Sequence, residues 1–192
     1  PFCDTGTIPV EAAMIARNMA PGCRRSFAAE AWPWLPGELW QQARDEAADL
    51  QQAAGAGRIV GSDSDAGAMK LAEAHAVIAG VAGDIHFRRR DFAELHTADR
   101  FGCLVANPPY GERLDNDEAL HTLYRDMPAV LARLDTWSHF ILTSYPDFES
   151  IMGRKADKRR KLYNGRLACT YFQFHGPPPG HDEPDEAGAL RP

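Results

Sequence analysis

The chain has 192 residues, of which 44% are hydrophobic and 25% are charged. This length suits one globular domain, and the ordinary hydrophobic share excludes a wholly disordered or collagen-like chain. No apolar run reaches the roughly 20 residues that cross a membrane, and a net charge of −6 argues against a protein that coats nucleic acid without specificity. The four cysteines form no C-x-x-C pair, which predicts neither a disulfide framework nor a zinc site and fits the cytoplasm.

The predicted elements alternate between short apolar strands and amphipathic helices. Helices are expected at 8–19, 38–54, 66–79 and 117–134, the last interrupted near Pro128, and strands at 58–62, 85–89, 103–106, 137–143, 161–163 and 167–174. The alternation predicts an α/β domain with a mostly parallel sheet, and Asn164-Gly165 predicts an antiparallel hairpin at its end. We expect the domain to cover residues 1–175, with a helical insertion at 21–54, before a disordered, acidic, Pro/Gly-rich tail at 176–192.

Ligands of such sheets bind outside the carboxyl ends of the strands, so the loops there carry the functional signals. The first loop leads into the first helix and comprises Phe2, Cys3, Asp4, Thr5, Gly6 and Thr7. A glycine-bearing turn before a helix offers backbone N–H groups to a carboxylate or a phosphate, although a purely structural tight turn is the commoner interpretation. A single glycine does not make the G-x-G-x-x-G motif of nicotinamide-binding proteins.

Two further loops carry carboxylates. Asp63 follows a predicted strand and is a candidate for binding both hydroxyls of a ribose. Asp65 is the candidate N-cap of the next helix. Asp91 is able to accept a hydrogen bond from the exocyclic amine of an adenine while Phe92 packs on its ring, but on these residues alone a solvated acid beside three arginines is the preferred interpretation.

The loop Asn107-Pro108-Pro109-Tyr110 is the strongest local signal. Two prolines end the preceding strand, stiffen the backbone and leave carbonyls that point outward. Asn107 adds a side-chain oxygen acceptor and Tyr110 adds a flat aromatic face. A base that carries an amino group would find acceptors and a stacking partner here, whereas the alternative is a rigid turn with a surface tyrosine.

These residues resemble class I S-adenosylmethionine-dependent methyltransferases. The most similar group comprises the catalytic domains of THUMP-containing ribosomal RNA guanine-N2 methyltransferases, which also carry the label N6-adenine-specific methylases. The resemblance covers roughly residues 1–175 and rests on the segments Pro1–Thr7, Gly61–Asp65, Asp91-Phe92, Asn107–Arg113 and Lys158–Gly165. It implies a Rossmann-like fold. The family usually has a strand and an aspartate before the position of Pro1, and glycine where Asp4 stands, so we expect this chain to lack the first strand.

The resemblance implies S-adenosylmethionine as the cofactor and no metal. The loop from Phe2 to Thr7 would hold its methionine end, Asp63 with Ser64 its ribose, and Asp91 with Phe92 its adenine. The loop from Asn107 to Tyr110 would hold the target base. Asp4, where the family usually has glycine, adds a negative charge that would repel the carboxylate of the methionine end and attract its amino or sulfonium group.

The function that the resemblance implies is methylation of guanine N2 in 23S ribosomal RNA. Six of the eight residues from Arg154 to Lys161 are basic, and the candidate RNA contacts are Arg113, Lys158, Arg159 and Arg160, with a solvated surface turn as the alternative. Since the chain starts without methionine or signal peptide, we expect a longer protein with an upstream THUMP-like RNA-binding domain and no membrane partner. Two other functions remain open, namely adenine-N6 methylation of DNA or RNA, and an inactive fold that serves only as an RNA-binding scaffold.

Overall fold

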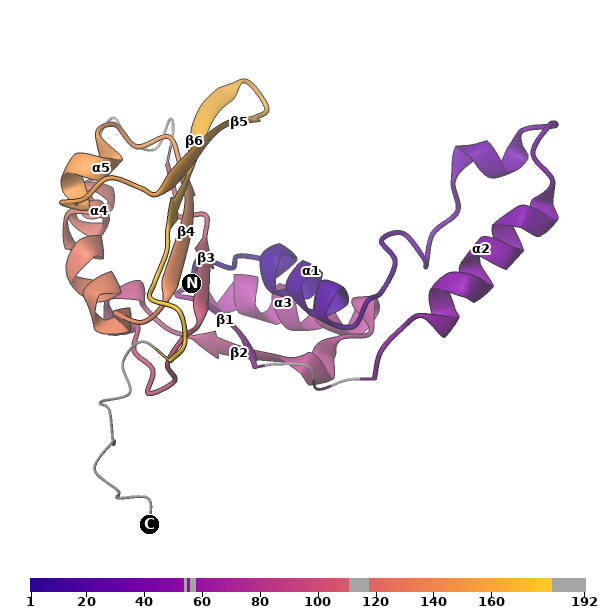
Figure 1. The fold of residues 1–192 in the computed structure, drawn as a ribbon, viewed down its shortest axis with the longest axis horizontal. Coiled ribbons are helices and arrows are strands. Elements are labelled where there is room, and N and C mark those ends of the chain that lie inside the picture. Colours follow the sequence, from indigo (N-terminus) through magenta and orange to yellow (C-terminus); the bar gives the residue numbers. More distant parts are fainter. Residues whose placement is uncertain (54, 56–57, 111–117, 181–192) are drawn as a thin grey trace, which may run out of the picture. The chain divides into compact units, whose positions relative to one another are not determined.

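A computed structural model describes residues 1–53, 55, 58–110 and 118–180. The chain divides into two compact units (Figure 1), one formed by residues 3–89 and the other by residues 1–2 with 90–192. Among the described residues, no helix is both long and apolar enough to cross a membrane.

The unit of residues 3–89 is built on two parallel strands. Strand β1 (Ile59–Asp63) pairs with β2 (Ile85–Arg89) in register from Ile59 opposite Ile85 to Asp63 opposite Arg89. Helices α1 (Thr7–Ala16) and α3 (Ala66–Ala79) pack against these strands and against each other (Figure 1). Short 3₁₀ helices lie at Ala28–Ala31 and Ala82–Asp84. The core of this unit is made mostly of small and aliphatic side chains, among them Ala13, Met19, Ala76, Val81 and Ile85.

Helix α3 has the bounds that its local signals predict. The carboxylate of Asp65 accepts a hydrogen bond from the Ala68 N–H at 2.7 Å, which makes it the expected N-cap. Gly80, at a φ of +75°, ends the helix in the left-handed conformation that glycine adopts without strain.

The helix of the insertion is shorter than predicted. Helix α2 covers Gly37–Asp49 rather than 38–54, and none of its residues is buried. The chain leaves the helix because the Gln52 N–H donates to the Arg17 carbonyl at 2.8 Å, instead of to a carbonyl of its own helix. The first helix also ends early, at Ala16 rather than at residue 19, and Asn18 takes a φ of +51°.

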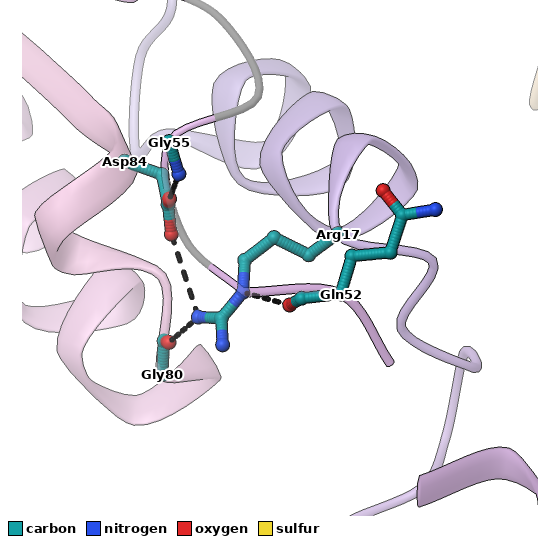
Figure 2. Close-up of polar contacts among 5 residues, drawn as sticks. All are labelled: Arg17, Gln52, Gly55, Gly80 and Asp84. Carbon is teal, nitrogen blue, oxygen red and sulfur yellow. Dashed lines mark hydrogen bonds and ion pairs between the residues drawn. The ribbon is translucent and has the colours of Figure 1, made fainter. Parts of the chain in front are cut away.

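Arg17 joins the end of the insertion to the turn between α3 and β2 (Figure 2). Its Nη1 donates to the Gly80 carbonyl at 3.0 Å and lies 3.5 Å from the Asp84 carboxylate. Its Nε donates to the Gln52 carbonyl at 3.3 Å, and the Gly55 N–H donates to Asp84 at 3.2 Å. One guanidinium therefore satisfies acceptors from two segments far apart in the sequence.

The second unit contains a four-stranded sheet in the order β3-β4-β6-β5. Its strands are β3 (Cys103–Ala106), β4 (Ser138–Thr143), β5 (Lys158–Asn164) and β6 (Leu167–Phe174). Strands β3 and β4 are parallel, whereas β6 is antiparallel to both β4 and β5. The predicted α/β class and the C-terminal antiparallel hairpin are thus confirmed.

Helices α4 (Glu118–Leu131) and α5 (Phe148–Ile151) lie on one face of this sheet (Figure 1). Short 3₁₀ helices lie at Phe92–Glu94 and Ala132–Leu134. The core includes Leu104, Tyr124, Leu131, Ile141, Phe148 and Phe174. We expected an interruption near Pro128, but α4 continues through it. Buried residues on both sides of Pro128 hold the helix against the sheet and outweigh the one hydrogen bond that proline removes.

Candidate functional site

The loop before α1 is joined to the end of β1 by its backbone. The Cys3 N–H donates to the Ser62 carbonyl at 3.1 Å, and the Asp4 N–H donates to Oδ2 of Asp63 at 3.0 Å. The Gly6 N–H closes the turn onto the Cys3 carbonyl at 2.8 Å. Four of the residues predicted for the cofactor therefore come together in the unit of residues 3–89.

The Cys3 side chain is buried in this loop, and burial raises the pKa of its thiol to about 11. The thiol consequently stays protonated at neutral pH and is a poor nucleophile. Cys3 contributes its backbone and its packing to the loop, rather than a reactive sulfur.

Gly6 occupies a position where a side chain would be strained and crowded. Its φ is +87°, and a Cβ added to it would lie 2.9 Å from Cβ and 3.0 Å from Cα of Ala72 in α3. The turn into α1 and the contact between α1 and α3 both require a residue without a Cβ.

We expect Gly6→Ala to destabilise the protein by about 1–3 kcal/mol, because it adds both left-handed strain and a clash with backbone. Urea unfolding measures the loss. Gly37→Ala is the matched control, since nothing lies within 4 Å of the Cβ it would add, and it should leave the unfolding midpoint unchanged or slightly raised. Equal midpoints for the two variants would contradict this assignment.

Asp63 holds the loop and still has capacity for a ligand. Its Oδ2 accepts the Asp4 N–H at 3.0 Å and its Oδ1 accepts the Asp65 N–H at 3.1 Å. A carboxylate has about four acceptor positions, so each oxygen retains one for a hydroxyl. The neighbouring Ser64 accepts a hydrogen bond from Arg89 Nε through its carbonyl at 3.0 Å.

Asp91 and Phe92 lie in the other unit and already have structural roles. The Asp91 carboxylate caps a 3₁₀ helix by accepting the Ala93 N–H at 2.8 Å. Phe92 is only 8% exposed and belongs to the core, where its ring centroid lies 4.9 Å from that of Phe2. Of the two rings predicted for the cofactor, the half-buried Phe2 is the more accessible.

The loop after β3 combines an exposed amide with a fixed backbone. Asn107 is exposed, Pro108 is fully buried, and Pro109 and Tyr110 are half-buried. The Tyr110 hydroxyl accepts a hydrogen bond from Asn164 Nδ2 at 3.3 Å. Burial raises the pKa of Tyr110, so its hydroxyl stays neutral.

Three connected hydrogen bonds fix the Pro109 carbonyl in place. The Tyr124 hydroxyl donates to this carbonyl at 3.0 Å and lies 2.7 Å from Thr143 Oγ1, which in turn accepts the Tyr145 N–H at 3.0 Å. Since a carbonyl only accepts and each hydroxyl has one proton, Thr143 must donate to Tyr124 and Tyr124 to Pro109. The direction of every bond is therefore determined.

The packing of Tyr124 supports these three hydrogen bonds. The Tyr124 ring is fully buried and stacks on Tyr145 with a centroid distance of 4.0 Å. Burial raises the pKa of Tyr124, which keeps the proton that Pro109 accepts. Sequence reasoning missed Tyr124, Thr143 and Asn164. The available signal was a tyrosine on the apolar face of α4, because a buried phenol needs a partner for its hydroxyl.

The predicted RNA contacts lie on β5, apart from Arg113, which falls outside the described residues. Every residue of β5 is exposed. Arg159 forms an ion pair with Glu149 at 2.9 Å, and the other oxygen of Glu149 accepts the Ala156 N–H at 2.7 Å. Within the described part of the chain, neither Lys158 nor Arg160 forms an ion pair, and no cluster of three or more His, Cys, Asp or Glu side chains is arranged to hold a metal.

The chain is similar in sequence to proteins named as RNA methyltransferases. The chain is 41% identical over 177 residues to "Putative RNA methyltransferase YpsC" of Bacillus subtilis, covering 91% of this chain and 45% of that protein. It is 35% identical to "Ribosomal RNA large subunit methyltransferase K/L" of Allochromatium vinosum, covering 99% of this chain and 28% of that protein. The chain therefore spans less than half the length of these relatives.

The chain is also similar to solved structures. SMU.472, named as a methyltransferase and crystallised with SAH, superimposes with a TM-score of 0.87 at 42% identity, over 93% of this chain and 47% of that one. A predicted N6-adenine-specific DNA methylase of Listeria monocytogenes gives a TM-score of 0.81 at 46% identity, over 92% of this chain and 46% of that one. A family model described as "RMKL-like, methyltransferase domain" matches residues 1–173. The chain belongs to this family of methyltransferase domains.

Proposed function

We propose that residues 1–175 form the catalytic domain of an RNA methyltransferase that modifies an exocyclic base amine, with guanine N2 of 23S ribosomal RNA as its target. The observation that carries the proposal is the loop from Asn107 to Tyr110, in which an exposed amide stands beside a backbone carbonyl that the buried Tyr124 holds by a hydrogen bond. The name of the large-subunit K/L relative supports ribosomal RNA as the substrate.

The residues of this chain fit S-adenosylmethionine as the cofactor. Asp63 retains acceptor capacity for the two ribose hydroxyls. At the start of α1, where no side chain caps the helix at Gly6, the first backbone N–H groups are offered to a carboxylate. When bound, S-adenosylmethionine supplies an electrophilic methyl group on a sulfonium. The SAH in SMU.472, a protein 42% identical to this chain, supports the assignment.

The chemistry that falls to the protein is positioning of the amine. An exocyclic amine is a poor nucleophile because its lone pair is delocalised into the ring. Hydrogen bonds from its two N–H groups to the Asn107 side-chain oxygen and the Pro108 carbonyl localise that pair and direct it. As positive charge develops on nitrogen, its proton becomes acidic enough to pass to water, so no strong base is required, and catalysis comes from orientation and fixed dipoles. Tyr110 supplies a stacking face, worth about 1–3 kcal/mol for a base taken out of its helix.

Nucleoside analysis tests the target. The protein is incubated with large-subunit ribosomal RNA and S-adenosylmethionine bearing a labelled methyl group, and the RNA is digested to nucleosides. We expect labelled N2-methylguanosine. Labelled N6-methyladenosine would instead show that the target base is adenine and not guanine, an outcome that the name of the Listeria relative favours.

Calorimetry separates an enzyme from an inactive scaffold. Saturable binding of S-adenosylmethionine is expected, with weaker binding in Asp63→Ala, because the carboxylate then neither holds the loop nor accepts the ribose hydroxyls. Absence of binding to the folded protein would sink the catalytic proposal and leave only an RNA-binding role.

A further inference from the structure

Strand β5 is the outer strand of its sheet and projects with β6 as a hairpin (Figure 1). All seven of its residues are exposed, and its first four are Lys158, Arg159, Arg160 and Lys161. These four basic residues follow one another without interruption, but they do not form a single patch. Because side chains alternate between the two faces of a strand, they form two half-runs on opposite faces.

The end of β5 identifies which face adjoins the candidate base-binding loop. Asn164 donates to the Tyr110 hydroxyl at 3.3 Å. Counting back by two from Asn164 places Leu162, Arg160 and Lys158 on its face. The ladder agrees, since these residues pair across the hairpin with Cys169, Tyr171 and Gln173, and paired residues of antiparallel strands share a face.

Two basic side chains of the opposite face, Arg159 and Lys161, make contacts within the protein. Arg159 is bound to Glu149 of α5 at 2.9 Å. Lys161 Nζ lies 5.4 Å from the centroid of the Tyr163 ring, within the range of a cation–π interaction. Arg159 also pairs across the ladder with Phe172, a core residue. This face therefore points toward the side of the sheet that carries α4 and α5.

We propose that the face of β5 carrying Lys158 and Arg160 binds the phosphates of single-stranded RNA next to the target nucleotide, and that Arg159 is structural. The inference rests on the proposed function and adds the path of the substrate to it. Arg160 stands four residues from Asn164, about 14 Å along an extended strand. It therefore reaches phosphates of neighbouring nucleotides rather than that of the base held at Tyr110.

The neighbouring positions Arg159 and Arg160 provide a matched pair of variants. Arg160→Gln and Lys158→Gln each remove one cation from the proposed RNA face, while Arg159→Gln removes the same charge from the other face. The full chain is titrated with the RNA substrate over a series of salt concentrations. The slope of log K against log salt is negative. We expect it to become shallower by about 0.7 in each of the first two variants, the value for one contact to a single strand.

Arg159→Gln should leave the slope unchanged and lower the melting temperature, because Glu149 loses its ion-pair partner and keeps the hydrogen bond from the Ala156 N–H. An equal change of the slope in Arg159→Gln and Arg160→Gln would overturn the division by faces. Unchanged slopes in all three variants would overturn the RNA path itself, while methylation of the RNA by the unmodified protein would still support the proposed function. No salt-dependent RNA binding and no methylation by the unmodified protein would instead contradict the proposed function.

Discussion

Replacing Asn107 by alanine is expected to lower kcat for RNA methylation by about 100- to 1000-fold, the usual effect of removing one preorganised polar group from a reacting centre. The side chain is exposed and supplies the acceptor that orients the amine, so its loss leaves the lone pair delocalised and undirected. Single-turnover methylation of large-subunit RNA measures the effect directly, free of product release.

The variant should differ from the unmodified protein in chemistry alone. Binding of S-adenosylmethionine and the melting temperature should stay unchanged, since Asn107 has no part in the core. Gln41→Ala, which removes another exposed amide from α2, is the control and should keep full activity. Near-normal methylation by Asn107→Ala would exclude the proposed mechanism.

Elements with local signals could be predicted from the sequence with correct bounds. Helix α3 and strands β2 and β3 match their expected residues. The cap Asp65 and the left-handed Gly80 act within a few residues of α3, and two prolines follow β3. Helix α2 ends earlier than expected because Gln52 bonds with Arg17, a partner 35 residues away. The residues near the end of the helix therefore could not predict this hydrogen bond.

The candidate site divides in the same way. Asn107, Asp63 and Gly6 stand directly beside strand or helix ends, where a loop motif is legible in the sequence. Tyr124 and Thr143 are 19 residues apart and Asn164 lies 54 residues from Tyr110, so only the folded sheet brings each pair together. Alternation along β5 puts Arg159 and Arg160 on opposite faces, but the register of the hairpin decides which face each residue occupies.

Tyr124→Phe is expected to lower kcat by about 10- to 100-fold, although Tyr124 touches neither the base nor the cofactor in the proposed mechanism. The hydrogen bonds from the Tyr145 N–H through Thr143 and Tyr124 to the Pro109 carbonyl form a relay. The variant removes the proton that this relay donates to the Pro109 carbonyl, and it leaves Thr143 Oγ1 without the acceptor it had. A loop backbone released by a fraction of an ångström misplaces the acceptors on Asn107 and Pro108, and displacements near 1 Å cost about 100-fold in rate.

Further variants distinguish positioning from mere stability. Thr143→Ser keeps the hydroxyl and should retain most of the kcat, whereas Thr143→Val should resemble Tyr124→Phe. Tyr163→Phe removes an exposed phenol that lies outside the relay, on the face of β5 opposite Arg160, and should leave kcat unchanged. A fall in melting temperature without a fall in kcat in Tyr124→Phe would reduce Tyr124 to a packing residue.

The pH dependence gives an independent measurement of the relay. Burial disfavours the phenolate and raises the pKa of Tyr124 above its usual value of about 10. The donated proton is therefore present at neutral pH and stays in place as the pH rises to about 10. Because the relay requires the protonated form, kcat should show no loss from this group over that range. A decline in kcat with a midpoint below about 10, present in the unmodified protein and absent in Tyr124→Phe, would mean that the phenol ionises normally and that the buried relay does not hold the loop.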